Sequence, residues 1–307
     1  MDTFLKRNNA SCKCKKTRNE CMNGNTLPIG FMQGRLCERV AGKIQAFPWR
    51  DWENEFYVAE AIDLHLMEWT LDQARLYENP LMTTDGQERI KGLCRNYGIS
   101  IYSLTGDCFM QAPFWKFEGV ARTDLQRDFL AIGAACAQVG IQMMVVPLVD
   151  NGRLDTAEQE DLLVKFLLEQ RPFLSEHNLK VIFESDFAPT ELARFINRLP
   201  AEQFGINYDI GNSAALGFVP IEEFAAYGKR IINVHVKDRV FGGTTVPLQT
   251  GNADFNSVFA ALSLTGYQGN YILQTARAVD GNHAEVLATY RDMTLLWLKQ
   301  FGLAAAT

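Results

Sequence analysis

The stretch IINVHVKDR at residues 231–239 decides the fold, because the chain repeats its pattern. It is an apolar, β-branched run of strand length that ends in charged residues. Runs of this kind alternate with longer segments of a 3.6-residue period, which is typical of amphipathic helices. The runs are PIGFMQGR (28–35), IDLHLMEWT (62–70), SIYSLTGDCF (100–109), IQMMVVPLV (141–149), KVIFESDF (180–187), GINYDIGN (205–212), IINVHVKDR (231–239) and NYILQTAR (270–277).

This eightfold alternation of strand and helix predicts an α/β fold, a closed (β/α)8 TIM barrel. We expect it as a single domain over residues 27–307. The alternative is a doubly wound open sheet, but no run is followed by a G-x-G-x-x-G or G-x-x-x-x-G-K phosphate-binding motif. Thr156, Pro189 and Pro220 are expected at helix starts, and the last helix is predicted over about 283–302.

Residues 1–26 are polar, basic and without period, so we expect a short disordered or flexible tail. Cys12, Cys14 and Cys21 lie in it and lack the fourth ligand of a structural zinc site. The chain has 7 cysteines, an odd number, and its N-terminus does not resemble a secretory signal. These features predict a reduced, cytoplasmic protein.

Composition limits the classes of partner. The chain has 30 Lys+Arg against 36 Asp+Glu, a net charge of -6, so nucleic acid is not an expected partner. Its apolar runs are shorter than the roughly 20 residues that span a bilayer, so no membrane segment is expected. The oligomeric state stays open, with a homo-oligomer among the alternatives.

Polar residues at the strand ends are the candidates for function, because TIM-barrel active sites lie at the C-terminal ends of the strands. Four of them fall at matching depth on four successive strands and offer oxygen or nitrogen donors. Mixed donors of this kind predict one divalent metal ion, such as Mn, Mg, Co or Zn. Two carboxylates buried in a barrel mouth without a cation would be costly. The four predicted ligands are Glu184, Asp209, His235 and Gln274.

A set of motifs resembles one known family. The motifs are GFMQGRL (30–36), QAFPWRDWENEF (45–56), LMEWT (66–70), FESD (183–186), NYDIGN (207–212), NVHVKDR (233–239) and TGNADF (250–255). From about residue 27 to 302 the chain resembles the xylose-isomerase-like sugar-phosphate isomerases and epimerases, close to L-ribulose-5-phosphate 3-epimerase and hydroxypyruvate isomerase. The resemblance implies that Glu184, Asp209, His235 and position 274 bind one divalent metal, and that two glutamate ligands exchange protons with the substrate.

Position 274 departs from the family, because it is Gln where the family has Glu. An amide oxygen can ligate a metal, but it has no titratable proton near neutral pH. We therefore expect an asymmetric proton transfer with one carboxylate base rather than a two-glutamate mechanism.

The reaction that this machinery suits is removal of a proton from a carbon beside a carbonyl. Glu184 is the expected base, and the candidates for returning the proton are Glu68, Asp107 and Lys237, in that order. The residues expected to be catalytic are thus Glu184, Glu68 and Lys237. The residues expected to bind substrate are Arg35, Gln33, Asp107, Asn212, Arg239 and Arg277.

Four cations at the strand ends predict an anionic substrate. Guanidinium groups favour phosphate or carboxylate, so a sugar phosphate or sugar acid is the expected small-molecule partner. In the alternative interpretation each cation pairs with a neighbouring carboxylate such as Asp238 or Asp186. The four cations are Arg35, Lys237, Arg239 and Arg277.

Two other functions stay open. A lyase that dehydrates a sugar acid or an inosose would use the same metal and base but expel water. A sugar-binding protein with weakened catalysis would be consistent with Gln274. The related barrel endonucleases are excluded because their metal site needs many histidines and this chain has 4.

Overall fold

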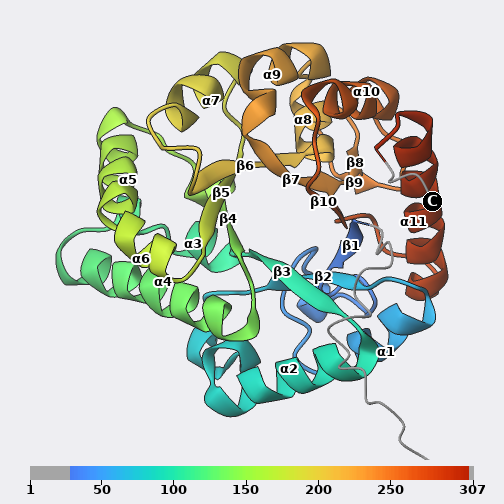
Figure 1. The fold of residues 1–307 in the computed structure, drawn as a ribbon, viewed down its shortest axis with the longest axis horizontal. Helices are drawn as coiled ribbons and strands as arrows, with labels where there is room; N and C mark the ends of the chain where they lie inside the picture. Colours follow the sequence, from blue (N-terminus) through green and yellow to red (C-terminus); the bar gives the residue numbers. More distant parts are fainter. Residues whose placement is uncertain (1–27, 304–307) are drawn as a thin grey trace, which may run out of the picture.

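A computed structural model describes residues 28–303 as a closed barrel (Figure 1). The predicted tail, with its three cysteines, lies outside the described residues. All eight barrel strands are parallel and pair in the order β1-β10-β7-β6-β5-β4-β3-β2, so the barrel prediction is confirmed and the open sheet is wrong. The strands are β1 (Ile29–Met32), β2 (Leu66–Thr70), β3 (Ser100–Thr105), β4 (Met143–Leu148), β5 (Lys180–Ser185), β6 (Phe204–Asp209), β7 (Ile231–Val236) and β10 (Asn270–Leu273).

Helices surround the barrel and occupy the connections between its strands (Figure 1). The α-helices are α1 (Asn54–Ala61), α2 (Thr84–Tyr97), α3 (Asp107–Gln111), α4 (Gly119–Val139), α5 (Ala157–Glu169), α6 (Arg171–Glu176), α7 (Pro189–Ile196), α8 (Ile210–Leu216), α9 (Pro220–Tyr227), α10 (Phe255–Thr265) and α11 (His283–Gln300). The short 3-10 turns are η2 (Val40–Gly42), η3 (Leu76–Glu78), η4 (Pro80–Met82), η5 (Phe114–Lys116), η6 (Asp150–Gly152) and η7 (Gly228–Arg230).

The helix starts follow the expected signals. The side chain of Thr156 accepts a hydrogen bond from the backbone N–H of Gln159 and caps α5. Pro189 and Pro220 are the first residues of α7 and α9, where a missing N–H costs nothing. These positions confirm the predicted starts.

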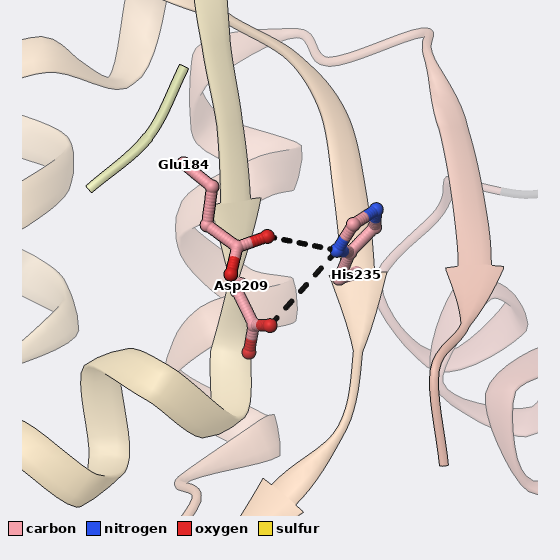
Figure 2. Close-up of side chains that lie close together, drawn as sticks. All are labelled: Glu184, Asp209 and His235. Atoms are coloured by element: carbon pink, nitrogen blue, oxygen red, sulfur yellow. Dashed lines mark ion pairs between the residues drawn. The ribbon is translucent and has the colours of Figure 1, made fainter. Parts of the chain in front are cut away.

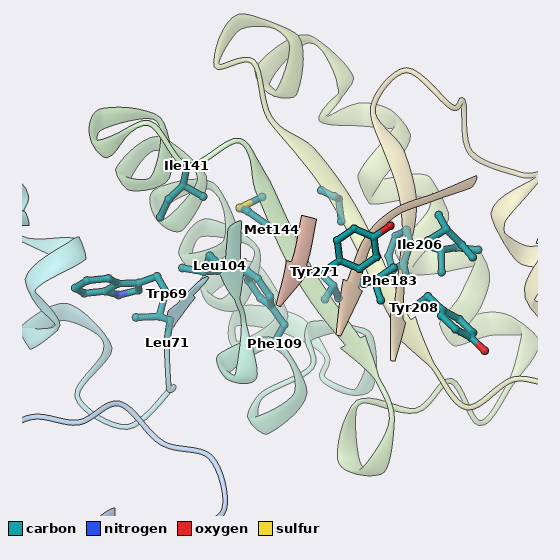
Figure 3. Packing of buried hydrophobic residues seen from close by; sticks show 14 of the residues in the cluster. Trp69, Leu71, Leu104, Phe109, Ile141, Met144, Phe183, Ile206, Tyr208 and Tyr271 are labelled. Carbon is teal, nitrogen blue, oxygen red and sulfur yellow. The ribbon is translucent and has the colours of Figure 1, made fainter. Parts of the chain in front are cut away.

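The core lies between the outer face of the barrel and the helices. Alternate strand residues such as Trp69, Leu104 and Phe183 point outward and pack in one large cluster (Figure 3). Their neighbours point into the barrel, as the two-residue period of a strand requires. Met32, Leu66 and Ile272 form a separate small cluster, which we place in the barrel interior.

Polar side chains fill the rest of the interior. Glu68, Ser103, Asn207, Asn233 and His235 are each 2% exposed or less. Buried polar groups must be hydrogen-bonded, and these bond to one another. The polar layer supports the ends of the strands, where the site lies.

A short antiparallel hairpin extends the loop after β7. It consists of β8 (Asp238–Arg239) and β9 (Thr245–Val246). Among the described residues, no helix has the length and apolar character needed to cross a membrane.

Candidate active site

Three of the predicted metal ligands converge at the ends of neighbouring strands. Glu184, Asp209 and His235 each offer a ligand atom, and these atoms lie within 4.8 Å of one another. Both carboxylates approach the same nitrogen of the imidazole, as Figure 2 shows: Nδ1 lies 3.2 Å from Glu184 Oε2 and 3.9 Å from Asp209 Oδ2. The spacing of the three groups resembles that of an ion-binding pocket.

The other nitrogen of His235 faces Glu68, which lies deeper in the barrel. Glu68 Oε1 is 2.7 Å from His235 Nε2, and its carboxylate also accepts hydrogen bonds from Ser103, Thr105 and Asn233. Glu68 is 0% exposed and is not among the residues that line the cavity described below. The carboxylate on Nε2 keeps a proton on that nitrogen, so Nδ1, which faces Glu184 and Asp209, is the nitrogen that could give up its proton to a metal.

The charges in this cluster stabilise one another. Burial alone would lower the pKa of His235, but the charge of Glu68 and the hydrogen bonds to Glu184 and Glu68 raise it to about 10. Burial opposes ionisation of Glu68 and Glu184, yet His235 holds the pKa of both carboxyl groups below its usual value. Both carboxylates are therefore ionised at neutral pH.

Lys237 and Gln274 meet beside this cluster. Lys237 Nζ lies 2.8 Å from Asp209 Oδ2 and donates to Gln274 Oε1 at 3.0 Å. A Cβ at Gly211 would come 2.7 Å from Lys237 Cγ, so a glycine is needed there for the lysine stem to pass. Gln274, the predicted fourth ligand, therefore accepts a hydrogen bond from the same lysine that pairs with Asp209.

A cavity of ≈ 580 Å³ opens above the cluster, a size typical of small-molecule sites. Glu184, Lys237 and Gln274 line it from the strand ends, and Asn212 lines it from α8. Asn212 Nδ2 donates to Glu184 Oε1 at 2.6 Å and so orients the carboxylate. Glu184, Lys237 and Gln274 therefore line the same cavity.

Two arginines line the same cavity, and neither forms an ion pair with a carboxylate of residues 28–303. Arg35 is 3% exposed, its Nε has no hydrogen-bond partner, and one of its amino groups donates to the Ile44 carbonyl. Burial and the nearby Arg277 lower the pKa of Arg35 to about 9, which still leaves it charged. Arg239 donates to Asn212 Oδ1 and the Gly243 carbonyl.

The alternative interpretation, in which the cations pair with neighbouring carboxylates, holds for Lys237, which pairs with Asp209, but within the described residues neither arginine pairs with Asp186 or Asp238. Asp186 pairs with Arg153 at 2.6 Å, and Asp238 accepts from the backbone N–H groups of Gly251 and Ala253. Two unpaired guanidinium groups at one cavity favour an anionic ligand.

Two predicted substrate contacts lie away from the cavity. Arg277 donates to the carbonyls of Gly34, Cys37 and Ile44, and so braces the loop after β1. Gln33 is 0% exposed and its Oε1 accepts from the Thr70 backbone N–H. Neither is among the cavity-lining residues.

Two buried carboxylates hold the loops that carry the arginines. Glu55 accepts from the backbone N–H groups of Gly34 and Leu36, on either side of Arg35. Asp238 fixes the segment at Gly251, where a Cβ would meet Asp238 Oδ1 at 2.2 Å. The motifs QAFPWRDWENEF and TGNADF therefore position the cavity wall.

The sequence analysis missed the asparagines beneath the cluster. Asn207 Nδ2 lies 3.1 Å from both Glu184 Oε2 and His235 Nδ1, and Asn233 donates to Glu68 and Asn207. The signal was present, because each Asn stands two residues before a predicted ligand and so shares its face of the strand.

The residues present fit a divalent metal. Two carboxylates and an imidazole are ligands that Mn, Co or Zn accept, and the Glu68–His235 bond is the outer support that a ligating histidine usually has. The metal would lie against Nδ1.

Comparisons with known proteins agree with this geometry. The family described as xylose isomerase-like TIM barrel matches residues 56–296. The chain is 36% identical to the L-ribulose-5-phosphate 3-epimerase UlaE of Salmonella paratyphi C over 105 residues, which are 34% of this chain and only 37% of the epimerase. It is 26% identical to an inosose dehydratase of Geobacillus thermodenitrificans over 209 residues, 58% of this chain and 69% of the dehydratase.

Solved structures share the fold at low sequence identity. The 3-keto-D-glucoside 4-epimerase YcjR of E. coli has a TM-score of 0.63 and 17% identity, covering 87% of this chain and 99% of that one. The IolI protein, solved with a zinc atom bound, has a TM-score of 0.68 and 14% identity, covering 89% and 98%. With the barrel, the strand-end cluster and the family match together, the chain belongs to the xylose isomerase-like TIM barrels.

Proposed function

We propose that this protein is a divalent-metal-dependent isomerase or epimerase that moves a proton beside the carbonyl of a phosphorylated or acidic sugar. One observation supports this most: Glu184, Asp209 and His235 converge beside a cavity lined by two arginines that have no carboxylate partner in the part of the chain that the structure describes. Proton transfer and binding of the anionic group would thus occur in the same cavity.

The metal would be held by Glu184, Asp209 and His235, with Gln274 as the predicted fourth ligand. When bound, it would polarise the carbonyl and the adjacent hydroxyl of the sugar. Its identity stays open among Mn, Mg, Co and Zn.

Glu184 is the proposed base. Its carboxylate lines the cavity and is oriented by two amide groups, from Asn207 at 3.1 Å and Asn212 at 2.6 Å. Its lowered pKa keeps it ionised and ready to accept a proton. Glu68, in contrast, would act through His235, by holding the ring.

Arg35 and Arg239 would bind the anionic group of the substrate. Each charge-assisted hydrogen bond to a phosphate would contribute about 1.5–3 kcal/mol. A sugar phosphate should therefore bind at least about tenfold more tightly than its neutral parent, and calorimetry with such a pair measures the difference. Equal affinities would remove the anion site from the proposal.

A dehydratase is the second candidate. Of the curated relatives named above, the inosose dehydratase matches over the longer segment, 209 residues. A dehydratase would begin with the same proton removal but would then expel a hydroxyl group as water.

The test is a screen of ketose phosphates, including L-ribulose 5-phosphate, and of inosose with metal-loaded protein in D₂O. Proton NMR follows exchange of the proton beside the carbonyl and the product formed. The proposal expects exchange with an isomeric product. A dehydrated product would favour the lyase, and binding without exchange would indicate a sugar-binding protein.

A further inference from the structure

Gln274 cannot carry a proton, so the proposed reaction has no second proton carrier at the end of β10. Epimerisation needs one group to remove the proton and another to deliver one to the same carbon from the other face. Three side chains were the candidates for this role: Glu68, Lys237 and Asp107. Their hydrogen bonds and ion pairs show which of them is free to deliver a proton.

Glu68 is unsuited to deliver a proton. It is 0% exposed, accepts four hydrogen bonds and lies behind the imidazole of His235. A carboxylate enclosed in this way has no path to a substrate in the cavity.

Lys237 is also engaged. Its ammonium group lies 2.8 Å from Asp209 and donates to Gln274. To deliver a proton it would have to leave an ionised partner that would itself bind the metal. Its geometry suits neutralising the charge of Asp209 instead.

Asp107 differs from both. It is the first residue of α3, separated from β3 by Gly106 alone, and it lines the cavity together with Glu184 and Arg35. Among the described residues, none donates a hydrogen bond to its carboxyl group or forms an ion pair with it. It is only 6% exposed, so a carboxyl group is held in a nearly closed space without a structural partner.

We infer that Asp107 is the acid that delivers the proton to the substrate, in place of the carboxylate that Gln274 replaces. This inference rests on the proposed function. Glu184 takes the proton from the carbon, and the C–H electron pair forms a double bond to the carbonyl carbon while the carbonyl oxygen gains the charge. The electron pair of that double bond then forms a new C–H bond with the proton of the Asp107 carboxyl group, whose O–H electron pair stays on Asp107, and the charge on oxygen re-forms the carbonyl. Exchange with water restores both groups.

The surroundings of Asp107 keep it protonated. Burial raises the pKa of Asp107 to about 8, and the charges of Asp72 and Glu184 add to this effect against Arg35 and His235. An acid with a pKa near the working pH is well matched to proton delivery.

The experiment compares Asp107→Asn with Asp150→Asn. Asp150 lies at the exposed rim of the same cavity, at a φ of 49° that Asn adopts readily, so it is a matched control for loss of a carboxylate. Each variant is loaded with Mn²⁺ and given, in D₂O, the ketose phosphate that the wild type epimerises. Proton NMR measures deuterium uptake into recovered substrate and, separately, formation of the epimer.

We expect Asp107→Asn to lose about 10²–10⁴-fold in epimer formation while deuterium uptake at the Glu184 side continues within about threefold. Asp150→Asn should change neither rate. Asp107→Glu should recover part of the epimer formation, and a thermal melt checks that each variant folds.

Two results would overturn the inference. Epimer formation at the wild-type rate in Asp107→Asn would show that another group delivers the proton. If deuterium uptake and epimer formation fell equally, Asp107 would act in substrate binding or in folding rather than in proton delivery. If the wild type itself exchanges no proton with any substrate tried, the proposed function fails and the inference falls with it, which is a distinguishable result.

Discussion

The two sides of the His235 ring hold carboxylates that look alike in the sequence and differ in the structure. Glu68, on the inner side, is fully buried and accepts four hydrogen bonds. Glu184, on the outer side, lines a cavity and is held by two amide groups. A carboxylate with all its hydrogen bonds made supports the ring, whereas one that opens onto a cavity can meet a ligand. The same residue type on two different strands, β2 and β5, therefore serves two purposes.

Replacing the ring itself should have the largest effect, because both sides depend on it. His235→Ala removes the nitrogen ligand and leaves Glu68 as a buried charge without its ion-pair partner. We expect metal content near zero and a loss of about 3–5 kcal/mol in the free energy of unfolding. Elemental analysis and urea denaturation measure the two. A variant that keeps one metal per chain would remove His235 from the site.

The inner side is tested by Glu68→Gln, which keeps the shape but removes the charge. The ring should then lose its fixed tautomer, and metal affinity should fall by about 10–100-fold. Titration with Co²⁺, followed by its visible spectrum, gives the affinity. Unchanged affinity would mean that Glu68 contributes only to packing.

The outer side is tested by Gln274→Glu, which introduces the carboxylate that the family resemblance implies at this position. An added charged ligand should tighten metal binding by about tenfold. It should also compete with Asp209 for Lys237, which lies one hydrogen bond from each. Weaker binding in the same Co²⁺ titration would contradict position 274 as a ligand.

A third buried carboxylate, away from the ring, gives the smallest expected effect. Glu223 is 2% exposed and accepts hydrogen bonds from the hydroxyl groups of Tyr208, Ser213 and Tyr227. Tyr227→Phe should cost about 1.5 kcal/mol in unfolding free energy and leave metal affinity unchanged. Loss of metal affinity would show that any buried carboxylate near β6 affects the site.

The sequence was sufficient to predict the fold, because the hydrophobic period and the length of each strand or helix can be read from neighbouring residues. Seven of the eight apolar runs contain a whole barrel strand, and the run 205–212 lacks only Phe204, the first residue of β6. The predicted runs extend past the strands, as with 270–277 against Asn270–Leu273 in the last case. In the last run the extra residues, QTAR, follow the strand and include Gln274 at the site. A run of apolar residues does not mark where pairing ends and a loop begins.

Contacts between strands were harder to predict. Sequence reasoning placed Glu184, Asp209 and His235 together, because parallel strands bring their ends to one edge. It did not show that Glu68 lies behind the ring or that Arg277 bonds to carbonyls rather than facing the cavity. Those outcomes depend on barrel register and on loop paths, which connect residues more than 160 positions apart.

The most direct test of the account is the position of a metal in crystals of the protein grown with Mn²⁺. Anomalous scattering locates the ion independently of the side chains. The account predicts one ion between Glu184, Asp209 and Nδ1 of His235, with Nε2 still bonded to Glu68. An ion on the Nε2 side, or no ion at this cluster in crystals that contain Mn²⁺, would contradict it.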